Sequence, residues 1–541
     1  MGQTPSNCYL TFHPASARLV SMNSLLQTVS GSNTFSIRDF GATGDGKAKD
    51  TAAIQQAIDA CTAAGGGRVY CPPGTYLLGT ITLKDNVELY LEADCTLLAS
   101  PELTDYEPNY LIYAKDARQI AIRGRGTIDG NGRSFLNPPP LPSPRAWMPR
   151  GPIPEHRPRA VVHFIDCVHV WITDVLFVDA MFFTVWPLGC DHVRIHGITI
   201  RSNRLSWNAD GVDPDCCRDV RISDCYIEAG DDAIAVKSDS HRLGRQKACE
   251  QIVVTNCTLI SPMCGIRIGY EGDSPIRDCT FSNLNIINSR RGICVQVATH
   301  RPFPGMASAF EGILIEHGPA IENISFSNIN LDTMKAFFFW VDHEASAPGC
   351  IRNVSFSNIS GSTERSSYIC GSPTIPLEEL RFSNVQLTVN GETDDQYARV
   401  VPDPYGHDQG RWGNWGTKGI PCAFYFRYVR DLDLHDVRVK WGRLAGPWME
   451  AIRMENVTRC DLSGLVARQA LSCPDAAAVR MNHVRDVSVR GCRAEAGTGT
   501  FLSVEGADSA GITLVGNDFQ RAARACHFHP EVPQTTVAKS Q

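Results

Sequence analysis

Short alternations of apolar and polar residues recur through the middle of the chain and share one polar ending. Each alternation closes with Ser or Thr followed by Asp or Asn. The instances are Ile172-Thr173-Asp174, Ile222-Ser223-Asp224, Val254-Thr255-Asn256, Phe281-Ser282-Asn283, Phe326-Ser327-Asn328, Phe356-Ser357-Asn358 and Phe382-Ser383-Asn384, with Ile195-His196-Gly197 as a variant. From Ile172 to Phe281 the steps are 23 to 32 residues, so one supersecondary unit repeats with loops of variable length.

The repeated unit predicts an all-β solenoid. Each unit has short period-two strands between turns and no helical stretch, which excludes alternating βαβ units. A propeller, with roughly 40 to 45 residues per blade, fits the spacing poorly. Stacked coils would align equivalent apolar side chains in one internal column, and Asn or Asp tolerates the left-handed backbone of a repeated turn. We therefore predict a parallel β-helix.

The ends of the solenoid predict a simple domain organisation. Residues 50 to 63 are expected to form an amphipathic N-terminal capping helix, with Asp50 as its N-cap, because an open coil would expose apolar side chains. Residues 1–32 are an unassigned extension, residues 33–520 form one β-helix catalytic domain, and residues 521–541 form a C-terminal tail. Long loops are expected near 136–158, which is rich in Pro, and near 390–420, which carries Tyr405, Trp412 and Trp415.

Composition narrows the classes of partner. The formal net charge is −7 and Lys and Arg are scattered, so a nucleic-acid partner is not expected. No apolar run reaches the roughly 20 residues that cross a bilayer, and the first residues lack a leader pattern. The 21 cysteines lie singly along predicted strands, as Cys225 and Cys257 do, and indicate buried thiols in a reducing compartment. We expect a cytoplasmic protein, or a secreted one if the N-terminus is incomplete. We expect no membrane partner, no metal and no other cofactor. The oligomeric state is not predicted.

Carboxylates are concentrated between Trp207 and Ser238. Asp210 and Asp231 lie 21 residues apart, near one repeat length, so stacking predicts that they share one wall of adjacent coils with Asp232. Asp is also a common turn former, and this interpretation is preferred for Asp213, Asp215, Asp219 and Asp224. The adjacent pair Asp231-Asp232 in a strand-like run is unfavourable without a function.

Clustered carboxylates suit glycoside hydrolysis. They raise one another's proton affinity, so one can hold a proton while another is ionised. The protonated group can donate its proton to the leaving oxygen, and the ionised group can activate water. When about 6.5 to 9.5 Å separates the two carboxyl groups, the attack of that water inverts the anomeric centre. The sequence therefore favours a carbohydrate substrate.

The stretch from Asn208 to Lys237 resembles glycoside hydrolase family 28, the polygalacturonase family, in which an Asn-Thr-Asp motif precedes an Asp-Asp motif. The similarity extends from Phe35 to about Leu387 and includes Pro72-Pro73-Gly74-Thr75-Tyr76. It implies a right-handed parallel β-helix and an inverting mechanism. The implied roles are general acid for Asp231, water activation for Asp232 and Asp210, and shaping of the sugar site for Asn208; Ala209 replaces the usual Thr.

Two further family motifs are altered. Met263-Cys264-Gly265 stands where the family has Gly-His-Gly, and Cys294-Val295-Gln296 stands where it has Arg-Ile-Lys. The missing cations normally bind the galacturonate carboxylate. Arg267 or Arg291 is a candidate for substitute charge in substrate binding, because a guanidinium suits a carboxylate, but either is also explained as a wall residue paired with an acid.

These features leave several functions open. The leading prediction is an inverting galacturonidase or polygalacturonase on pectin-type polysaccharide or oligosaccharide. A rhamnogalacturonan or other modified pectic glycan is an alternative substrate because the binding motifs are altered. A β-helix polysaccharide lyase, using acids to hold Ca²⁺, and a carbohydrate-binding solenoid without catalysis are alternatives of other classes.

Overall fold

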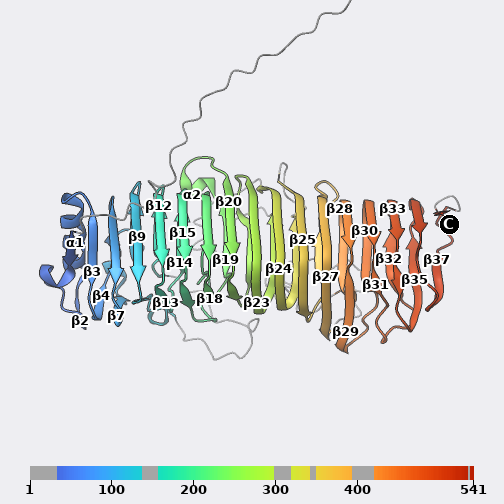
Figure 1. Ribbon diagram of the computed structural model, residues 1–541, viewed down its shortest axis with the longest axis horizontal. Helices are drawn as coiled ribbons and strands as arrows, with labels where there is room; N and C mark the ends of the chain where they lie inside the picture. Colours follow the sequence, from blue (N-terminus) through green and yellow to red (C-terminus); the bar gives the residue numbers. More distant parts are fainter. Residues whose placement is uncertain are drawn as a thin grey trace, which may run out of the picture.

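The computed structural model describes residues 33–136, 156–297, 318–341, 349–392, 420–533 and 537–540. These residues form a long stack of parallel strands, drawn with its axis horizontal in Figure 1. Nearly all of the two predicted long loops, including Tyr405, Trp412 and Trp415, lies outside the described residues.

The described strands build three walls, each a ladder of parallel strands. Wall 1 contains β5 (Ile81–Thr82), β8 (Ile112–Lys115), β11 (Ala160–Ile165), β14 (Phe183–Leu188), β19 (Ile234–Ser238), β22 (Cys264–Gly272), β26 (Ser367–Cys370), β32 (Ala477–Asn482), β35 (Thr498–Glu505) and β37 (Ala522–Phe528). Wall 2 contains β1 (Thr34–Ser36), β3 (Gly67–Cys71), β6 (Val87–Leu91), β9 (Arg118–Gly124), β12 (Val168–Thr173), β15 (Asp191–His196), β17 (Arg218–Ser223), β20 (Cys249–Thr255), β33 (Arg485–Arg490), β36 (Ala510–Val515) and β38 (Val537–Ser540).

Wall 3 is made of shorter strands. It contains β2 (Asp45–Lys49), β4 (Gly74–Leu78), β7 (Cys95–Ala99), β10 (Thr127–Asp129), β13 (Leu176–Val178), β16 (Thr199–Arg201), β18 (Tyr226–Glu228), β21 (Thr258–Ile260), β29 (Arg438–Ala445), β31 (Val466–Ala467) and β34 (Arg493–Ala494). Six longer strands turn corners and join two or three walls: β23 (Ile276–Val297), β24 (Ala320–Val341), β25 (Cys350–Thr363), β27 (Leu377–Glu392), β28 (Phe424–His435) and β30 (Ile452–Ser463). Short 3-10 turns lie at η2 (Ile37–Phe40), η3 (Leu103–Asp105) and η4 (Gly132–Phe135).

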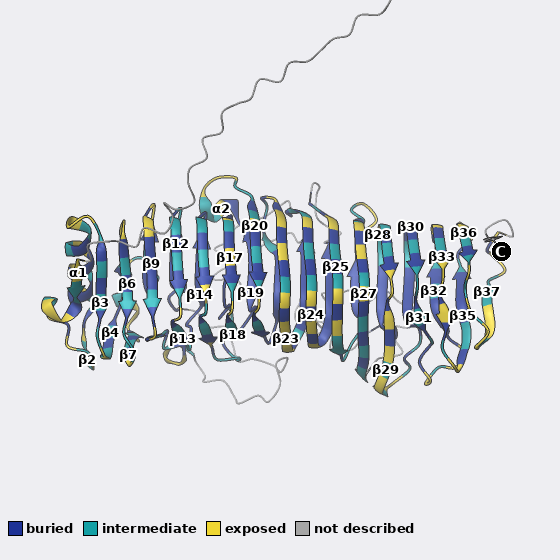
Figure 2. Cartoon of the chain, viewed as in Figure 1, coloured by how far each residue is buried: buried dark blue, intermediate teal, exposed yellow. Residues whose placement is uncertain are grey.

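The repeated apolar positions stack in one column inside the coils, as predicted. On wall 2, Ile172 pairs with Ile195, Ile195 with Ile222, and Ile222 with Val254. The column continues through Phe281, Phe326, Phe356 and Phe382, whose neighbouring ring centroids lie 4.9, 4.9 and 4.6 Å apart. Figure 2 shows the resulting alternation of buried and more exposed residues along the strands. A parallel β-helix is therefore confirmed; its right-handedness stays a prediction.

The polar residue that ends each repeat has the left-handed backbone that the sequence predicts. φ is +65° at Asp174, +59° at Asp224 and +56° at Asn328. The asparagine side chains bond mainly to one another rather than to the backbone: Asn328 donates to Asn283 at 3.1 Å, and Asn358 donates to Asn328 at 3.0 Å. These turns thus form a side-chain ladder along the outside of the stack.

A helix, α1 (Thr51–Ala63), lies at the N-terminal end of the stack (Figure 1). It buries Ile54, Ala57, Ile58 and Cys61 and packs against β1, β3 and β5. Asp50 occupies the N-cap position, but its side chain makes no cap hydrogen bond and accepts instead from the backbone N–H groups of Thr43 and Gly44. The predicted helix is thus present without the predicted cap bond, and its role in closing the first coil stays a prediction.

The C-terminal end differs from the prediction of a tail after residue 520. Strands β37 and β38 pair in parallel with β35 and β36 and extend the ladders. The segment Ala522-Ala523-Arg524-Ala525 lacks the Ile, Val and Phe alternation of earlier coils, so the sequence pattern did not reveal this strand.

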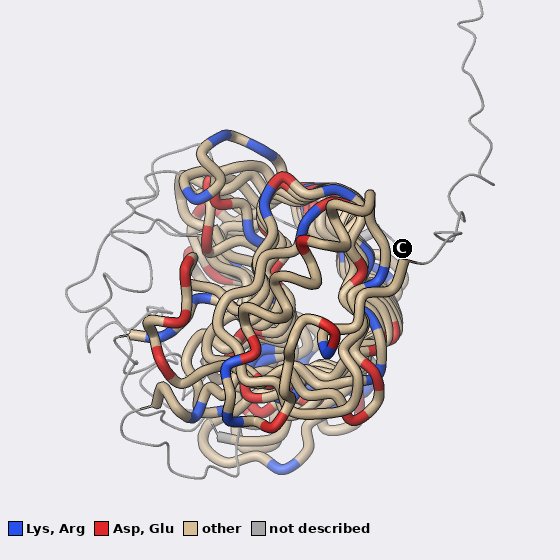
Figure 3. The backbone as a smooth tube through the Cα atoms, turned by 90° about the vertical axis from the view of Figure 1, so that its left-hand side faces the viewer, with Lys and Arg blue, Asp and Glu red and all other residues tan. Residues whose placement is uncertain are grey.

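Charges are mixed along the stack. In the view along its axis, Lys and Arg are interspersed with Asp and Glu over the coils (Figure 3). Cys225, Cys257 and Cys279 are buried free thiols, as predicted. In the part of the chain that the structure describes, no helix has the length and apolarity to cross a membrane.

Candidate active site

Three aspartates predicted to act together lie on neighbouring rungs of wall 1, between β14 and β22. Val212 bridges to Val185 of β14 on one side and to Ile234 of β19 on the other. This register places Asp210 level with Asp232, one residue from Asp231. The backbone N–H of Gly211 accordingly donates to the carbonyl of Asp232 at 2.9 Å.

Asp210 is buried beside a lysine. The whole residue is 4% exposed, and Lys237 Nζ lies 3.3 Å from Oδ2. The other oxygen, Oδ1, has no hydrogen-bond partner among the described residues. Burial raises the pKa of Asp210 well above its ordinary value, and Asp213, Asp231 and Asp232 raise it further while Lys237 lowers it. The three predicted carboxylates are therefore close enough to interact electrostatically.

Asp231 and Asp232 have different partners. Asp231 Oδ2 accepts a hydrogen bond from the backbone N–H of Asn208 at 2.9 Å. Arg267 donates to both carboxylate oxygens of Asp232, and the backbone N–H of Cys264 donates to Oδ1 at 3.0 Å. The two adjacent carboxylates thus differ in their surroundings, because Arg267 holds Asp232 through a two-pronged guanidinium contact.

Arg267 is a wall residue paired with an acid, which was one of its two interpretations. It is 4% exposed, donates to Gln296 Oε1 at 2.8 Å and lies over the ring of Tyr270. Arg291 is also buried and lies 4.6 Å from the ring centroid of Phe338. The predicted substrate contact of Arg267 would therefore compete with its bonds to Asp232.

Asn208 connects the site to an arginine that the sequence analysis missed. It has φ +57°, and its side-chain oxygen accepts from Arg157 Nη2 at 3.0 Å. Arg157 also donates to the carbonyls of Met181 and Trp207. Because Arg157 is distant in sequence, no local motif could identify it as a support for the Asn208 turn.

Lys237 is a central cation that the sequence did not single out. It is fully buried, lies 3.3 Å from Asp213 and 3.4 Å from Glu271, in addition to Asp210, and sits 3.7 Å from the ring centroid of Phe183. Burial lowers the pKa of Lys237, but Asp213, Glu271 and Asp210 outweigh that effect and raise it above the ordinary value. This lysine neutralises several acids on the wall.

The turn interpretation fits two of the four other aspartates. Asp219 and Asp224 have positive φ. Asp213 and Asp215 are instead fully buried in the wall, and burial raises the pKa of each to about 7. The turn interpretation was wrong for this pair because the sequence alone does not show Lys237 against Asp213, or the Asp239 N–H that donates to Asp215 at 2.7 Å.

The altered motif positions are buried next to these acids. Cys294 pairs in register with Arg267, and its thiol donates to Gln296 Oε1 at 3.0 Å. One rung further, Arg291 pairs with Lys335, which is 7% exposed. Burial lowers the pKa of Lys335 to about 7, and Arg291 and Arg290 add to the effect.

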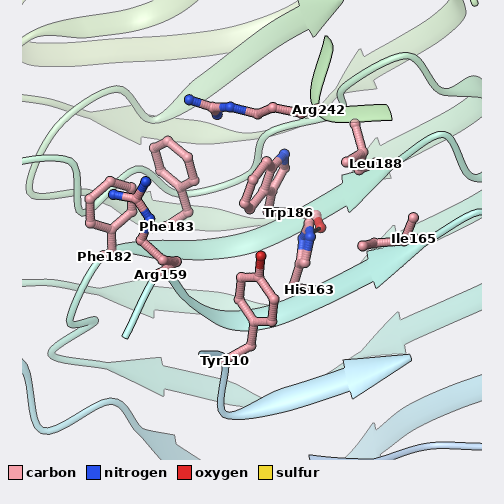
Figure 4. Close-up of a pocket in the computed structure, with 9 residues that line it drawn as sticks. All are labelled: Tyr110, Arg159, His163, Ile165, Phe182, Phe183, Trp186, Leu188 and Arg242. Carbon is pink, nitrogen blue, oxygen red and sulfur yellow. Dashed lines mark hydrogen bonds between the residues drawn. The ribbon is translucent and has the colours of Figure 1, made fainter. Parts of the chain in front are cut away.

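A cavity of about 130 Å³ lies on the same wall, on the rungs before Asp210. Aromatic rings and two arginines line it (Figure 4): Tyr110, Arg159, His163, Ile165, Phe182, Phe183, Trp186, Leu188 and Arg242. The sequence analysis did not identify these residues, since they are spread over several coils. In the described part of the chain, no group of three His, Cys, Asp or Glu is placed to hold a metal ion.

A parallel β-helix with clustered carboxylates on one wall is a fold and site suited to carbohydrate chemistry, and the family comparison makes this specific. Residues 61–403 match the family described as Glycosyl hydrolases family 28. The match covers more than half of the chain, which belongs to this family. It is therefore a glycosidase that hydrolyses O-glycosyl bonds, and the lyase and non-catalytic alternatives are disfavoured.

The chain is similar in sequence to plant proteins named as polygalacturonases. A probable polygalacturonase of Vitis vinifera is 27% identical over 391 residues, covering 65% of this chain and 74% of the relative. Polygalacturonase-2 of Solanum lycopersicum is 26% identical over 379 residues, covering 66% and 75%.

Solved structures show the same fold. An exopolygalacturonase from Thermotoga maritima superposes with a TM-score of 0.55 at 22% identity, covering 66% of this chain and 87% of that one. A family 28 exopolygalacturonase from Yersinia enterocolitica has a TM-score of 0.58 at 18% identity, covering 84% and 78%.

Proposed function

We propose that this glycosidase hydrolyses pectin-type polysaccharide or oligosaccharide with inversion at the anomeric centre, with Asp231 as general acid and with Asp232 and Asp210 activating water. The observation that carries the proposal is the placement of three carboxylates on neighbouring rungs of wall 1. The relatives named polygalacturonase support the pectic substrate.

The electrostatics of the cluster favour retention of a proton within it. Burial and neighbouring carboxylates raise the pKa of Asp210, so the cluster can retain a proton at a pH at which isolated carboxyls are ionised. Hydrolysis needs one protonated and one ionised group at the same time. Lys237 on Asp210 and Arg267 on Asp232 give the two water-activating groups different cationic partners.

Arg267 acts in this proposal as a positioning residue. Its guanidinium donates to both oxygens of Asp232 and is itself held by Gln296. A fork of this kind fixes the plane of a carboxylate. Gln296, at an altered motif position, therefore supports the orientation of Asp232 through Arg267.

A modified pectic glycan such as rhamnogalacturonan remains the second candidate substrate. It is favoured by Cys264 and Cys294, which put thiols where the family carries a histidine and an arginine, while Gln296 stands at the lysine position. Turnover of defined homogalacturonan and rhamnogalacturonan oligosaccharides, measured side by side as released reducing ends, separates the two.

The assignment of Asp231 is tested by Asp231→Asn. Loss of the general acid should reduce turnover of pectic oligosaccharides roughly 10²- to 10⁴-fold with unchanged thermal unfolding. Asp224→Asn is the matched control, because Asp224 is exposed at a turn of wall 2. Full activity of Asp231→Asn would refute the role.

A further inference from the structure

The ammonium group of Lys237 lies between three carboxylates of wall 1. Its Nζ is 3.3 Å from Asp210 Oδ2, 3.3 Å from Asp213 Oδ2 and 3.4 Å from Glu271 Oε1. It also lies 3.7 Å from the ring centroid of Phe183. The Lys237 side chain is 1% exposed, so solvent and salt screen these ion pairs little.

Lys237 is the cation on which Asp210 and Asp213 depend. Among the residues that the structure describes, no other Lys, Arg or His side chain lies within 4 Å of either carboxylate. Glu271 of β22 has a further partner, Arg242 of α2 (Ser240–Leu243), at 3.5 Å. Asp210 and Asp213 therefore compete for one ammonium group, whereas Glu271 shares two cations.

The other charged groups that act on Asp210 are acids. Burial raises the pKa of Asp210 most. Asp213, in the same segment, and Asp231 and Asp232, just before β19, raise it further, whereas Lys237 lowers it. The Oδ1 atom of Asp210 has no hydrogen-bond partner among the described residues. The contact with Lys237 at Oδ2 is thus the one that favours the ionised form.

We propose that Lys237 is a positioning residue that sets the pH range of hydrolysis, because its ammonium group against Asp210 Oδ2 favours the ionised form in which Asp210 activates water. The inference rests on the proposed function, in which Asp210 has that role. A carboxyl group must be ionised to accept a proton from water. Asp213 weakens the effect, since it draws on the same ammonium group.

Replacing Lys237 by Met tests the inference through the pH dependence of kcat/KM, which reports the ionisation of the free enzyme. Activity that needs ionised Asp210 is present above its pKa and is lost below it. Removing an opposite charge at this distance raises a carboxyl pKa by about 1 to 3 units, so the acidic limb should move upward by that amount. The basic limb should move less, because Asp231 accepts from the backbone of Asn208. A merely structural role would lower activity equally at every pH.

Asp213→Asn should move the acidic limb in the opposite direction. It removes a like charge from beside Asp210 and a competitor for Lys237, so the limb should move roughly 1 pH unit downward. This variant also removes a buried charge instead of leaving one unpaired, and it decides the question if Lys237→Met does not fold.

Arg194→Gln is the matched control, because Arg194 pairs with Asp219 on wall 2 and its loss should leave the pH profile as in the native chain. Thermal unfolding of each variant is measured alongside. An unchanged acidic limb in a folded Lys237→Met or in Asp213→Asn would overturn the inference, and so would shifts of both variants in the same direction.

Asp210→Asn separates this inference from the proposed function. If Asp210→Asn abolishes turnover while Lys237→Met keeps the native acidic limb, the role of Lys237 alone fails. If Asp210→Asn keeps full turnover of pectic oligosaccharides, the water-activating role of Asp210 fails, and the role of Lys237 fails with it.

Discussion

Individual cations divide the acids of wall 1 into separate groups. Lys237 forms ion pairs with Asp210, Asp213 and Glu271, whereas Arg267 forms an ion pair with Asp232. Asp231 accepts a backbone N–H from Asn208. Chemically identical side chains therefore have distinct surroundings, which is how neighbouring carboxyls acquire different roles.

Replacing Arg267 by Lys tests its positioning role. A lysine keeps the charge but cannot hold both oxygens of Asp232, so we expect kcat to fall roughly 10²-fold with little change in KM, as for a misplaced catalytic group. Steady-state kinetics on a pectic oligosaccharide measure this, with Arg194→Lys as control. An unchanged kcat would show that Asp232 needs no such support.

Asp215 predicts a pH dependence of stability. Burial and Asp239 raise its folded-state pKa to about 7, above the ordinary value of 3.8. The folded protein therefore binds more protons between these values, and the stability that Asp215 contributes is present below about pH 4 and lost as pH rises through about 7. Asp215→Asn should flatten this slope by up to about 1.4 kcal/mol per pH unit.

Denaturant unfolding at several pH values between 4 and 8 measures that slope. Asp224→Asn, at an exposed turn, should leave it as in the native chain. An equal slope in the native chain and in Asp215→Asn would contradict the account of Asp215.

At the scale of elements, the repeated turn was readable from sequence and its bonding was not. Ser or Thr followed by Asn predicted a left-handed residue at each coil, and the structure has φ near +56° at Asn283, Asn328 and Asn358. That these side chains bond to one another follows from the register between coils, which the variable loop lengths hide in the sequence.

Asn328 lies in the middle of this ladder and separates its two contributions. Asn328→Gly keeps the left-handed backbone but removes the bonds to Asn283 and Asn358, whereas Asn328→Ala adds backbone strain. We expect Asn328→Ala to lower the free energy of unfolding by about 1 to 3 kcal/mol more than Asn328→Gly does. Equal losses in denaturant unfolding would assign the role to the side-chain bonds alone.

For the whole molecule, the spacing of apolar repeats was sufficient to predict the parallel β-helix, because stacking is the way such short strands bury their apolar faces. The same spacing predicted that Asp210 and Asp231 lie on one wall of adjacent coils, and the pairing of Val212 with Ile234 places Asp210 level with Asp232. Lys237, Arg157 and the aromatic cavity were missed, since their contacts join residues from different coils and leave no local pattern.

The stereochemistry of the cleaved bond tests the central claim most directly. The native chain is incubated with defined pectic oligosaccharides, and NMR follows the first-formed product before its anomers equilibrate. Three carboxylates acting on one sugar, with water attacking opposite the leaving group, predict a product whose anomeric configuration is opposite to that of the cleaved bond. Retention of configuration, or no cleavage of any pectic oligosaccharide, would contradict the account.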